Sequence, residues 1–239
     1  RFEDVLESAG VRIHTSMPIE RIARQGGRLR VRAAGNETVY DRVVFTGASA
    51  LATRVCDGLT GTEKAAFGST LYQGIVCASV LLEKPLRGSY ITYIADETIP
   101  FTAVIEMTAI VDRQQFGGRS LVYLPAYVAC DDPLFEVPDE EIERRFLGAL
   151  MRMQPQIARS DIAAFRISRV RHVLAISTLN YTANLPPIRT SIPGLFVLNS
   201  AHIVNASLNV NDTIRLANER MPLLLSSIED EALALAGAA

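Results

Sequence analysis

Most of the side chains that could carry chemistry lie in the stretch NSAHIVNASLNVNDTIRLANE, residues 199–219, in which asparagine occurs five times. An apolar strand pattern precedes this stretch, and a helical pattern begins within it at about residues 210–213. The first turn of a helix presents unpaired backbone N–H groups and partial positive charge. Such a helix end can bind an electron-rich group: a phosphate, a carboxylate or the pyrimidine edge of a ring cofactor.

The same residues also have a purely structural interpretation. Asparagine and aspartate cap helices and tolerate unusual backbone angles, so Asn211 or Asp212 is predicted as the N-cap from the local sequence. His202 is expected to be a hydrogen-bonding loop residue, because the sequence shows no catalytic partner for it. No Ser-His-Asp order, phosphate loop or zinc-ligand spacing occurs, which argues against hydrolases and metalloenzymes and predicts no metal site.

Composition excludes further classes of protein. The chain has 239 residues, a formal net charge of −2 and no basic stripe, so nucleic acid is not an expected partner. Its three scattered cysteines fit no metal spacing and indicate a reducing, cytoplasmic setting. No apolar run is long enough to cross a membrane. The chain starts at Arg1 and enters a helical pattern at once, which we interpret as a fragment or a processed chain.

Periodicity predicts the elements of the first part of the chain. Leu29, Val31 and Ala33 alternate with arginines, which is typical of a strand with one buried face. Gly26-Gly27 can supply the positive φ angles of a hairpin turn. The predicted elements are a helix over FEDVLESA closed by Gly10, a strand VRIHT at 11–15, a β-meander at 19–47 whose last strand is Val43 to Phe45, and helices at 49–56 and 62–68.

From Tyr72 the sequence is rich in strand patterns. One helix interrupts them at 138–153, with acidic residues in its first turn and an inner face of Ile142, Phe146, Leu150 and Met153. The predicted strands are 72–86, 89–95, 100–108, 120–128, 161–177 and 194–200. Ile214, Ala217, Met221 and Leu224 are predicted to form the buried stripe of a long final helix.

This layout predicts a mixed α/β protein whose chain leaves one domain, builds a second and returns to the first. The expected first domain comprises residues 1–70 and 190–239, and the expected second domain comprises residues 71–189. Periodicity alone does not identify the chemistry of either domain.

Two motifs resemble a known superfamily. PGLFVLNSA and LNVNDTIRLA are similar to the carboxy-terminal motif of flavin-dependent amine oxidases, whose superfamily includes protoporphyrinogen oxidases and phytoene desaturases. The segment GVRIHTSMPIERIARQGGRLRVRAAGNETVYDRVVFTGAS is similar to the part of these proteins that follows their first substrate-domain excursion. The resemblance covers roughly residues 1–228, and it departs from the usual pattern at Asn199-Ser200, where glycine is common.

The resemblance implies FAD as the cofactor, held by part of a Rossmann-like domain into which a mixed-sheet substrate domain is inserted. It places the backbone of Ile19 beside the adenosine half of FAD and the strand end at Thr46-Gly47 close to the cofactor. The remaining cofactor-binding residues that it implies are Asn199, Ser200, Asn209, Val210, Asn211, Asp212 and Thr213, which surround the start of the helix under the isoalloxazine.

The resemblance also implies that the sheet after Tyr72 forms a roof over the flavin, with the substrate between them. Glu106 interrupts an apolar strand there, and we expect it to bind a substrate amine or to act as a base, unless it pairs with an arginine at the sheet edge. Tyr181 is the second candidate catalytic residue, and with Tyr123 and Tyr127 it is a candidate for an aromatic wall. The lysine that reaches the flavin through water in many amine oxidases has no match, which leaves desaturation open beside amine oxidation.

No G-x-G-x-x-G fingerprint for the pyrophosphate occurs in the chain, so this piece alone is expected to bind FAD poorly. Three functional classes follow: an FAD-dependent oxidoreductase that transfers hydride from a small or apolar substrate, a non-catalytic binding module, and a flavin-dependent isomerase or mutase. A small-molecule substrate is the expected partner, and peripheral membrane contact is expected if that substrate is lipid-like. The sequence leaves the oligomeric state open.

Overall fold

The computed structural model describes residues 1–86, 88–204 and 208–236, and the chain divides into two compact units. Unit 1 comprises Arg1–Thr70 and Ser177–Ala239, and unit 2 comprises Leu71–Ile176. Helices and strands are mixed in the order of the chain, which confirms the predicted mixed α/β class.

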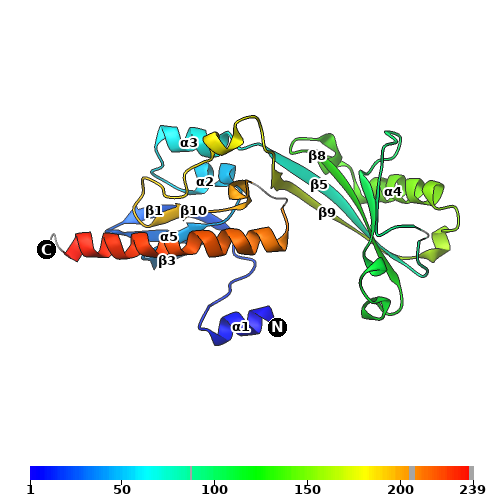
Figure 1. The fold of residues 1–239 in the computed structure, drawn as a ribbon, viewed down its shortest axis with the longest axis horizontal. Helices are drawn as coiled ribbons and strands as arrows, with labels where there is room; N and C mark the ends of the chain where they lie inside the picture. The colour runs from blue at the N-terminus through cyan, green and yellow to red at the C-terminus, as the bar shows by residue number, and fades with distance from the viewer. Residues whose placement is uncertain (87, 205–207, 237–239) are drawn as a thin grey trace. The chain divides into compact units, whose positions relative to one another are not determined.

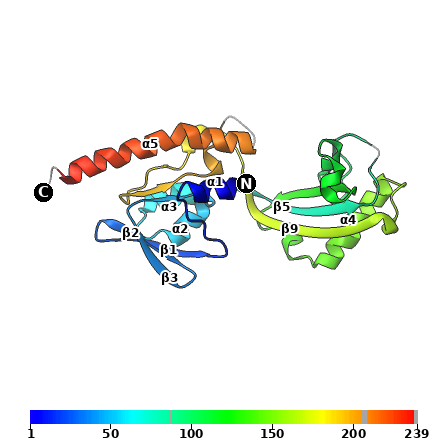
Figure 2. The ribbon, with the colours of Figure 1, turned by 90° about the horizontal axis from the view of Figure 1, so that it is seen from below.

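Unit 1 contains the amino-terminal elements and the carboxy-terminal ones (Figures 1 and 2). Figure 2 shows the long helix α5 on one side of this unit and the β1–β3 meander on the other. Its elements are α1 (Phe2–Ser8), β1 (Ile19–Gln25), β2 (Arg28–Ala33), β3 (Asn36–Tyr40), β4 (Val43–Phe45), α2 (Ser49–Val55), α3 (Gly61–Gly68), the 3-10 turns η5 (Tyr181–Asn184) and η6 (Ser200–His202), β10 (Leu195–Val197) and α5 (Val210–Ala236).

The meander of β1, β2 and β3 forms as predicted, with antiparallel pairing throughout. Leu29 is fully buried, whereas Arg28 and Arg32 on the other face are exposed. Gly26 and Gly27 have φ angles of 55° and 84°, so the β1–β2 turn uses a backbone conformation that favours glycine.

Two predictions for the amino-terminal part are wrong. Residues 11–15 are not a strand, because this exposed segment pairs with no other strand in the part of the chain that the structure describes. β4 does not extend the meander, because it pairs in parallel with β10 instead, aligning Val44 with Phe196. Two segments that are far apart in the sequence therefore lie side by side in one small sheet.

The prediction for the buried stripe of α5 is also largely wrong. Leu224 is buried as predicted, but Ile214, Ala217 and Met221 are exposed. Leu216 takes their place, packing with Leu224 against Phe196 and Leu198. The apolar arc of α5 is broader than one stripe, and the sequence does not show which part of that arc the sheet covers.

Unit 2 is built around one antiparallel sheet of five strands in the order β6-β7-β8-β5-β9. The strands β6 and β7 are much shorter than the segments predicted at 89–95 and 100–108. The elements are β5 (Tyr72–Leu82), β6 (Ile91–Tyr93), β7 (Ala103–Glu106), η1 (Met107–Ala109), η2 (Arg113–Phe116), β8 (Ser120–Ala129), η3 (Pro133–Glu136), α4 (Asp139–Met153), η4 (Arg159–Asp161) and β9 (Ile162–Ala175).

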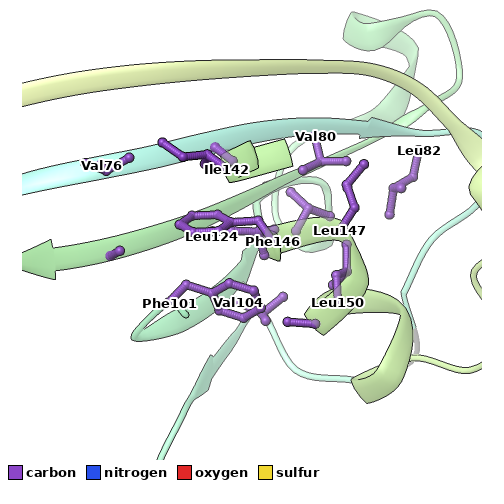
Figure 3. Packing of buried hydrophobic residues seen from close by; sticks show 14 of the residues in the cluster. Val76, Val80, Leu82, Phe101, Val104, Leu124, Ile142, Phe146, Leu147 and Leu150 are labelled. Atoms are coloured by element: carbon purple, nitrogen blue, oxygen red, sulfur yellow. The ribbon is translucent and has the colours of Figure 1, made fainter. Parts of the chain in front are cut away.

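Helix α4 covers one face of this sheet (Figure 3). Ile142, Phe146 and Leu150 are fully buried, as the helical spacing predicted, and Met153 is partly buried. They contact the even-numbered residues of β5 and β8, such as Val80 and Leu124. The odd-numbered residues of β5 point to the opposite face, where their neighbours on β8 and β9 include the exposed Tyr127 and Val170.

The second boundary between the units falls at Ile176/Ser177, so residues 177–189 belong to unit 1 and not to the domain predicted for them. This segment is held by β10 and η6. The backbone N–H of Val197 donates to the carbonyl of Ile188, and the hydroxyl of Tyr181 donates to the carbonyl of Ala201.

In the described part of the chain, no helix has both the length and the apolar character that spanning a bilayer would need. All three cysteines are free thiols.

Candidate functional site

Asn199 joins the carboxyl ends of the two parallel strands of unit 1. It lies just beyond β10, and its side-chain Nδ2 donates to the carbonyl of Gly47 at 2.7 Å and to the hydroxyl of Ser49 at 3.2 Å, both just beyond β4. Its Oδ1 accepts the backbone N–H of Ala201 at 3.0 Å, and the residue is buried. Ligands of parallel α/β sheets bind at the carboxyl ends of the strands, so Asn199 shapes the edge where a ligand is expected.

Because the side-chain amide of Asn199 is engaged within the protein, it fixes the geometry of this edge, and the cofactor contact predicted for Asn199 stays a prediction. Gly47 is constrained in the same place, since a Cβ atom there would lie 2.7 Å from the ring of Phe45. Thr46 is exposed and Ser200 is partly exposed, so both are accessible beside this clamp.

Ser49 is a site residue that the sequence analysis missed. Its side chain is buried against Asn199, 150 positions away. A serine that follows a strand and the short segment Thr-Gly-Ala carries no local signal for that contact. Only the parallel pairing of β4 with β10 brings the two residues together.

His202 is a structural hydrogen-bonding residue, as predicted. Its Nε2 lies 3.2 Å from the carbonyl of Pro186, and its Nδ1 accepts the backbone N–H of Asn199 at 3.2 Å. Both contacts are satisfied by the neutral tautomer that carries its proton on Nε2. Burial lowers the pKa of His202 and Arg220 lowers it further, against the opposing effect of the hydrogen bonds to Pro186 and Asn199.

His202 therefore makes the protein sensitive to acid. Below pH about 6.5, the usual value for histidine, the unfolded chain binds this proton more readily than the folded chain, so stability falls with falling pH. Above that pH, His202 is neutral in both the folded and the unfolded state and contributes no pH dependence of stability.

The urea midpoints measured at pH 7.5 and pH 5.0 should differ less in His202→Gln than in the parent protein. The same substitution at the exposed His14 should leave the difference intact, and an unchanged difference in His202→Gln would contradict this role.

The N-cap of α5 is Asn209, not Asn211 or Asp212 as predicted. The Oδ1 of Asn209 accepts the backbone N–H of Asp212 at 2.9 Å, and its Nδ2 donates to the Asp212 carboxylate at 2.7 Å. This reciprocal pair satisfies the third N–H group of the helix, in the manner of a capping box. The sequence offered three amide or acid side chains close together, and the turn uses the earliest of them.

The carboxylate of Asp212 is engaged by two side chains at the start of α5. One carboxylate oxygen accepts from Asn209 and the other forms a 2.7 Å ion pair with Arg215. The negative charge is therefore locally balanced, which removes the conflict that a free carboxylate would create with an electron-rich ligand.

Two backbone N–H groups at the start of α5 remain available. Among the described residues, no acceptor lies within hydrogen-bond distance of the N–H of Val210 or Asn211, and both residues are exposed. The N–H of Thr213, by contrast, is bonded to the carbonyl of Asn209. Two such donors at a helix N-terminus fit a ring edge that presents a carbonyl oxygen or an anionic nitrogen.

Beside this helix start lies a cavity of about 380 Å³ within unit 1. Its polar lining comes largely from α5, and its apolar lining comes largely from the loop that follows η6. The lining residues are His202, Ile203, Val204, Asp212, Arg215, Leu216, Glu219 and Arg220. Ile19 is not among them, since it lies at the start of β1, where it is exposed.

Glu106 is at the end of β7 in unit 2, where its carboxylate meets the backbone, and within residues 1–86, 88–204 and 208–236 no arginine is recorded as its partner. It accepts the backbone N–H of Leu86 at 3.2 Å, and only 5% of the residue is exposed. In the alternation of β7, Glu106 shares its face with Val104, which packs in the core under α4. Tyr123 pairs with Ile105 on the other face. The proposed catalytic role of Glu106 stays a prediction.

Tyr181 and Tyr127 lie in different units and different surroundings. Tyr181 is in the turn η5 of unit 1, where its hydroxyl donates to Ala201 at 2.7 Å. Tyr127 is exposed on β8 in unit 2, and Tyr123 lies on the same strand. The structure brings Asn199, Ser200 and Gly47 together in unit 1, whereas Glu106 belongs to unit 2.

Comparison with known proteins gives a family and a fold. The family model described as flavin containing amine oxidoreductase matches residues 1–205. No curated protein matches the chain.

Several solved structures share the fold. An oxidoreductase from Methanosarcina mazei matches with a TM-score of 0.67 and 19% identity, covering 95% of this chain and 52% of that one. A protein from Exiguobacterium sp. 255-15, assigned as a protoporphyrinogen oxidase, matches with a TM-score of 0.72 and 14% identity, covering 94% and 50%. Wild-type putrescine oxidase bound to putrescine matches with a TM-score of 0.67 and 18% identity, covering 92% and 51%. The present chain thus spans about half the length of these proteins.

Proposed function

Because the chain belongs to the flavin-containing amine oxidoreductase family, whose cofactor is FAD, we propose that it is the carboxy-terminal part of an FAD-dependent oxidoreductase. The substrate that we propose is a small or apolar organic molecule that loses a hydride. Bound FAD supplies the hydride acceptor. The observation that carries the proposal is the start of α5, where the N–H groups of Val210 and Asn211 have no acceptor among the described residues and Asp212 is neutralised by Arg215.

The residues of unit 1 have distinct roles in this proposal. The N–H groups of Val210 and Asn211 bind the electron-rich edge of the ring and stabilise negative charge there. Asn199 holds the strand ends at Gly47 in place, so that Thr46 and Ser200 are presented at a fixed edge. Asn209 positions the helix by capping it.

We assign substrate contact to the face of the unit 2 sheet that α4 leaves uncovered. Residues on that face include Ile75, Tyr123 and Tyr127, which are partly buried or exposed. Their aliphatic and aromatic character suits an apolar or amine-bearing molecule. Contact with a membrane surface would follow only for a lipid-like substrate.

The experiment uses the complete polypeptide encoded by the gene. Purified protein should show flavin absorbance, and anaerobic addition of an oxidisable amine such as putrescine, or of a porphyrinogen, should bleach it. Reversible conversion of UDP-galactopyranose without net oxidation would overturn the proposal in favour of a mutase, a class that has a fold neighbour with a TM-score of 0.61. Complete protein that is folded but free of flavin would favour a binding module.

A substitution tests the role of α5 in the same protein. Val210→Pro removes one available N–H group at the first helical position, where proline is tolerated. Loss of one hydrogen bond to a charged or strongly polar ring should weaken flavin binding by about 10- to 150-fold, since such bonds contribute about 1.5–3 kcal/mol. The matched control is Arg28→Ala, on the exposed face of the meander, which should leave flavin affinity unchanged. If Val210→Pro bound flavin as tightly as Arg28→Ala does, the start of α5 would not be part of the flavin-binding site.

A further inference from the structure

Strand β9 carries three arginines, and their side chains differ in the partners that they contact. The guanidinium group of Arg169 forms an ion pair with Asp139 at 2.6 Å, and that of Arg171 forms an ion pair with Glu136. Arg166 is exposed, and its side chain has no ion pair or hydrogen bond within the residues that the structure describes. Arg166 is therefore the arginine of this strand whose side-chain donors are available to a ligand.

The side chain of Arg166 points to the face of the sheet that α4 leaves uncovered. Its neighbours along the strand, Phe165 and Ile167, pack against the core under α4. Successive side chains of a strand point to opposite faces, so Arg166 points away from that core. Arg169 is on the α4 side with Phe165 and Ile167, and it reaches the first residue of that helix.

The strand register places Arg166 at one end of a row of side chains that crosses the open face. From β9 to β6, the directly paired residues of this row are Arg166, Ser79, Tyr123, Ile105 and Ile91. Residues that pair directly across two strands point to the same face. The row is therefore polar on β9 and β5, and it is aromatic and aliphatic on β8, β7 and β6. With about 4.8 Å between neighbouring strands, the backbones of Arg166 and Tyr123 are roughly 10 Å apart.

The surroundings of Arg166 provide hydroxyl groups and no acid. Ser79 lies opposite Arg166 on β5, and Ser168, two residues further along β9, points to the same face. The strands β5, β8 and β9 contain no aspartate or glutamate. Glu83, directly after β5, forms an ion pair with Arg119 at 2.9 Å. The positive charge of Arg166 thus has no counter-charge on the described strands beside it, and an anionic ligand would supply one.

We propose that Arg166 binds the carboxylate of a substrate whose apolar body lies along Tyr123 and Ile105. This inference rests on the proposed function, in which the same face contacts the substrate, and it narrows the substrate class to apolar molecules that carry an acidic group. The planar guanidinium fork matches a carboxylate with two parallel hydrogen bonds. The hydroxyl groups of Ser79 and Ser168 are further donors for the same oxygens. The row sets the acidic group roughly 10 Å from the part of the substrate that contacts Tyr123.

Decanoate and decanamide test this site in the complete polypeptide, because they share one apolar chain and differ in the charge of the head group. Both are used below the concentrations at which they aggregate. Isothermal titration calorimetry should show that the parent protein binds decanoate at least about tenfold more tightly than decanamide, since hydrogen bonds to a charged group are stronger than those to a neutral one.

Arg166→Gln should remove most of this preference for decanoate. It should leave the urea midpoint unchanged, because the side chain is exposed and unpaired in the described part of the chain. The matched control is Arg169→Gln, which removes an arginine from the same strand but from the opposite face, and it should keep the preference even if the protein is less stable. Arg144→Gln, at an exposed position of α4, is a second control that should change neither binding nor stability.

Arg166→Glu separates ligand binding from a general role of charge at the edge of the sheet. Charged residues on an edge strand such as β9 discourage pairing with other chains, and glutamate serves that purpose as well as arginine does. Arg166→Glu should nevertheless bind decanoate more weakly than decanamide, because like charges repel. An unchanged preference for decanoate in both Arg166→Gln and Arg166→Glu would overturn the binding role of Arg166.

The failure of this inference is distinguishable from the failure of the proposed function. A complete protein whose flavin is bleached by putrescine, but which binds decanoate no more tightly than decanamide, would overturn the acid-binding site and leave the flavoenzyme standing. A complete protein that is free of flavin but binds decanoate in an Arg166-dependent manner would support the acid-binding site and refute the proposed function.

Discussion

Alanine in place of Gly194 is expected to destabilise unit 1 by about 3 kcal/mol or more. Gly194 has a φ of 82°, a conformation that costs other residues about 1–2 kcal/mol. The added Cβ would also lie 2.8 Å from the backbone oxygen of Asp41, which cannot move without disturbing β4. Because the carbonyl of Gly194 accepts the N–H of Val43, the substitution acts on the first bond of the parallel sheet.

Two other glycines separate the two costs of Gly194→Ala, the strained backbone conformation and the contact of the added Cβ with Asp41. Gly27 has a φ of 84°, but the Cβ that alanine would add there meets no atom within 4 Å, so Gly27→Ala measures the backbone cost alone, about 1–2 kcal/mol. Gly68 ends α3 with open space around it, and Gly68→Ala should be neutral or stabilising by up to about 1 kcal/mol. Urea unfolding followed by circular dichroism measures all three. A loss for Gly194→Ala no larger than that for Gly27→Ala would show that the contact with Asp41 is unimportant.

The second large effect is expected in unit 2, where Phe146→Ala should cost about 3–5 kcal/mol. Phe146 is fully buried in the middle of α4, and its ring meets that of Phe101 edge to face, with 5.5 Å between the centroids. Removing the ring leaves a cavity between the helix and the sheet that close-packed neighbours fill only in part (Figure 3). The loss should appear as a lower urea midpoint of unit 2.

The adjacent Arg145 provides the matched control. Its side chain is exposed and pairs with Glu141 on the solvent side of α4, so Arg145→Ala should change stability by no more than about 0.5 kcal/mol. Phe146→Leu should fall between the two variants, because most of the apolar volume remains. A cost below about 1 kcal/mol for Phe146→Ala would mean that α4 is not the main cover of this sheet.

Local sequence patterns predicted the helices and strands that bury one face and repeat their buried residues at a regular spacing. The alternation around Leu29 identified the meander, and the spacing of Ile142, Phe146 and Leu150 identified both α4 and its inner face. The pattern predicted the wrong structure where burial depends on a neighbour. Residues 11–15 alternate like a strand but pair with none of the described strands, and an apolar arc on α5 does not by itself show which part meets Phe196.

The candidate site divides in the same way. The motifs at residues 193–201 and 208–217 indicated a strand, a turn and a helix start, and the family match over residues 1–205 covers the first of them. The roles of individual amides did not follow from the motif. Asn209 is the cap because it stands one residue before the helix begins, and Asn199 is a clamp because Gly47 and Ser49 lie across the parallel sheet from it.

The sequence by itself determined the mixed α/β class, the position of most elements and the resemblance to the family whose model matches residues 1–205. Those properties depend on side chains a few residues apart, whose spacing is fixed by the helix and strand repeats. Only the tertiary structure decided that β4 pairs with β10, that Asn199 reaches Ser49, and that Glu106 lies on the core face of its sheet. Such contacts join distant parts of the chain, and they depend on which surfaces can be buried together, which no local repeat encodes.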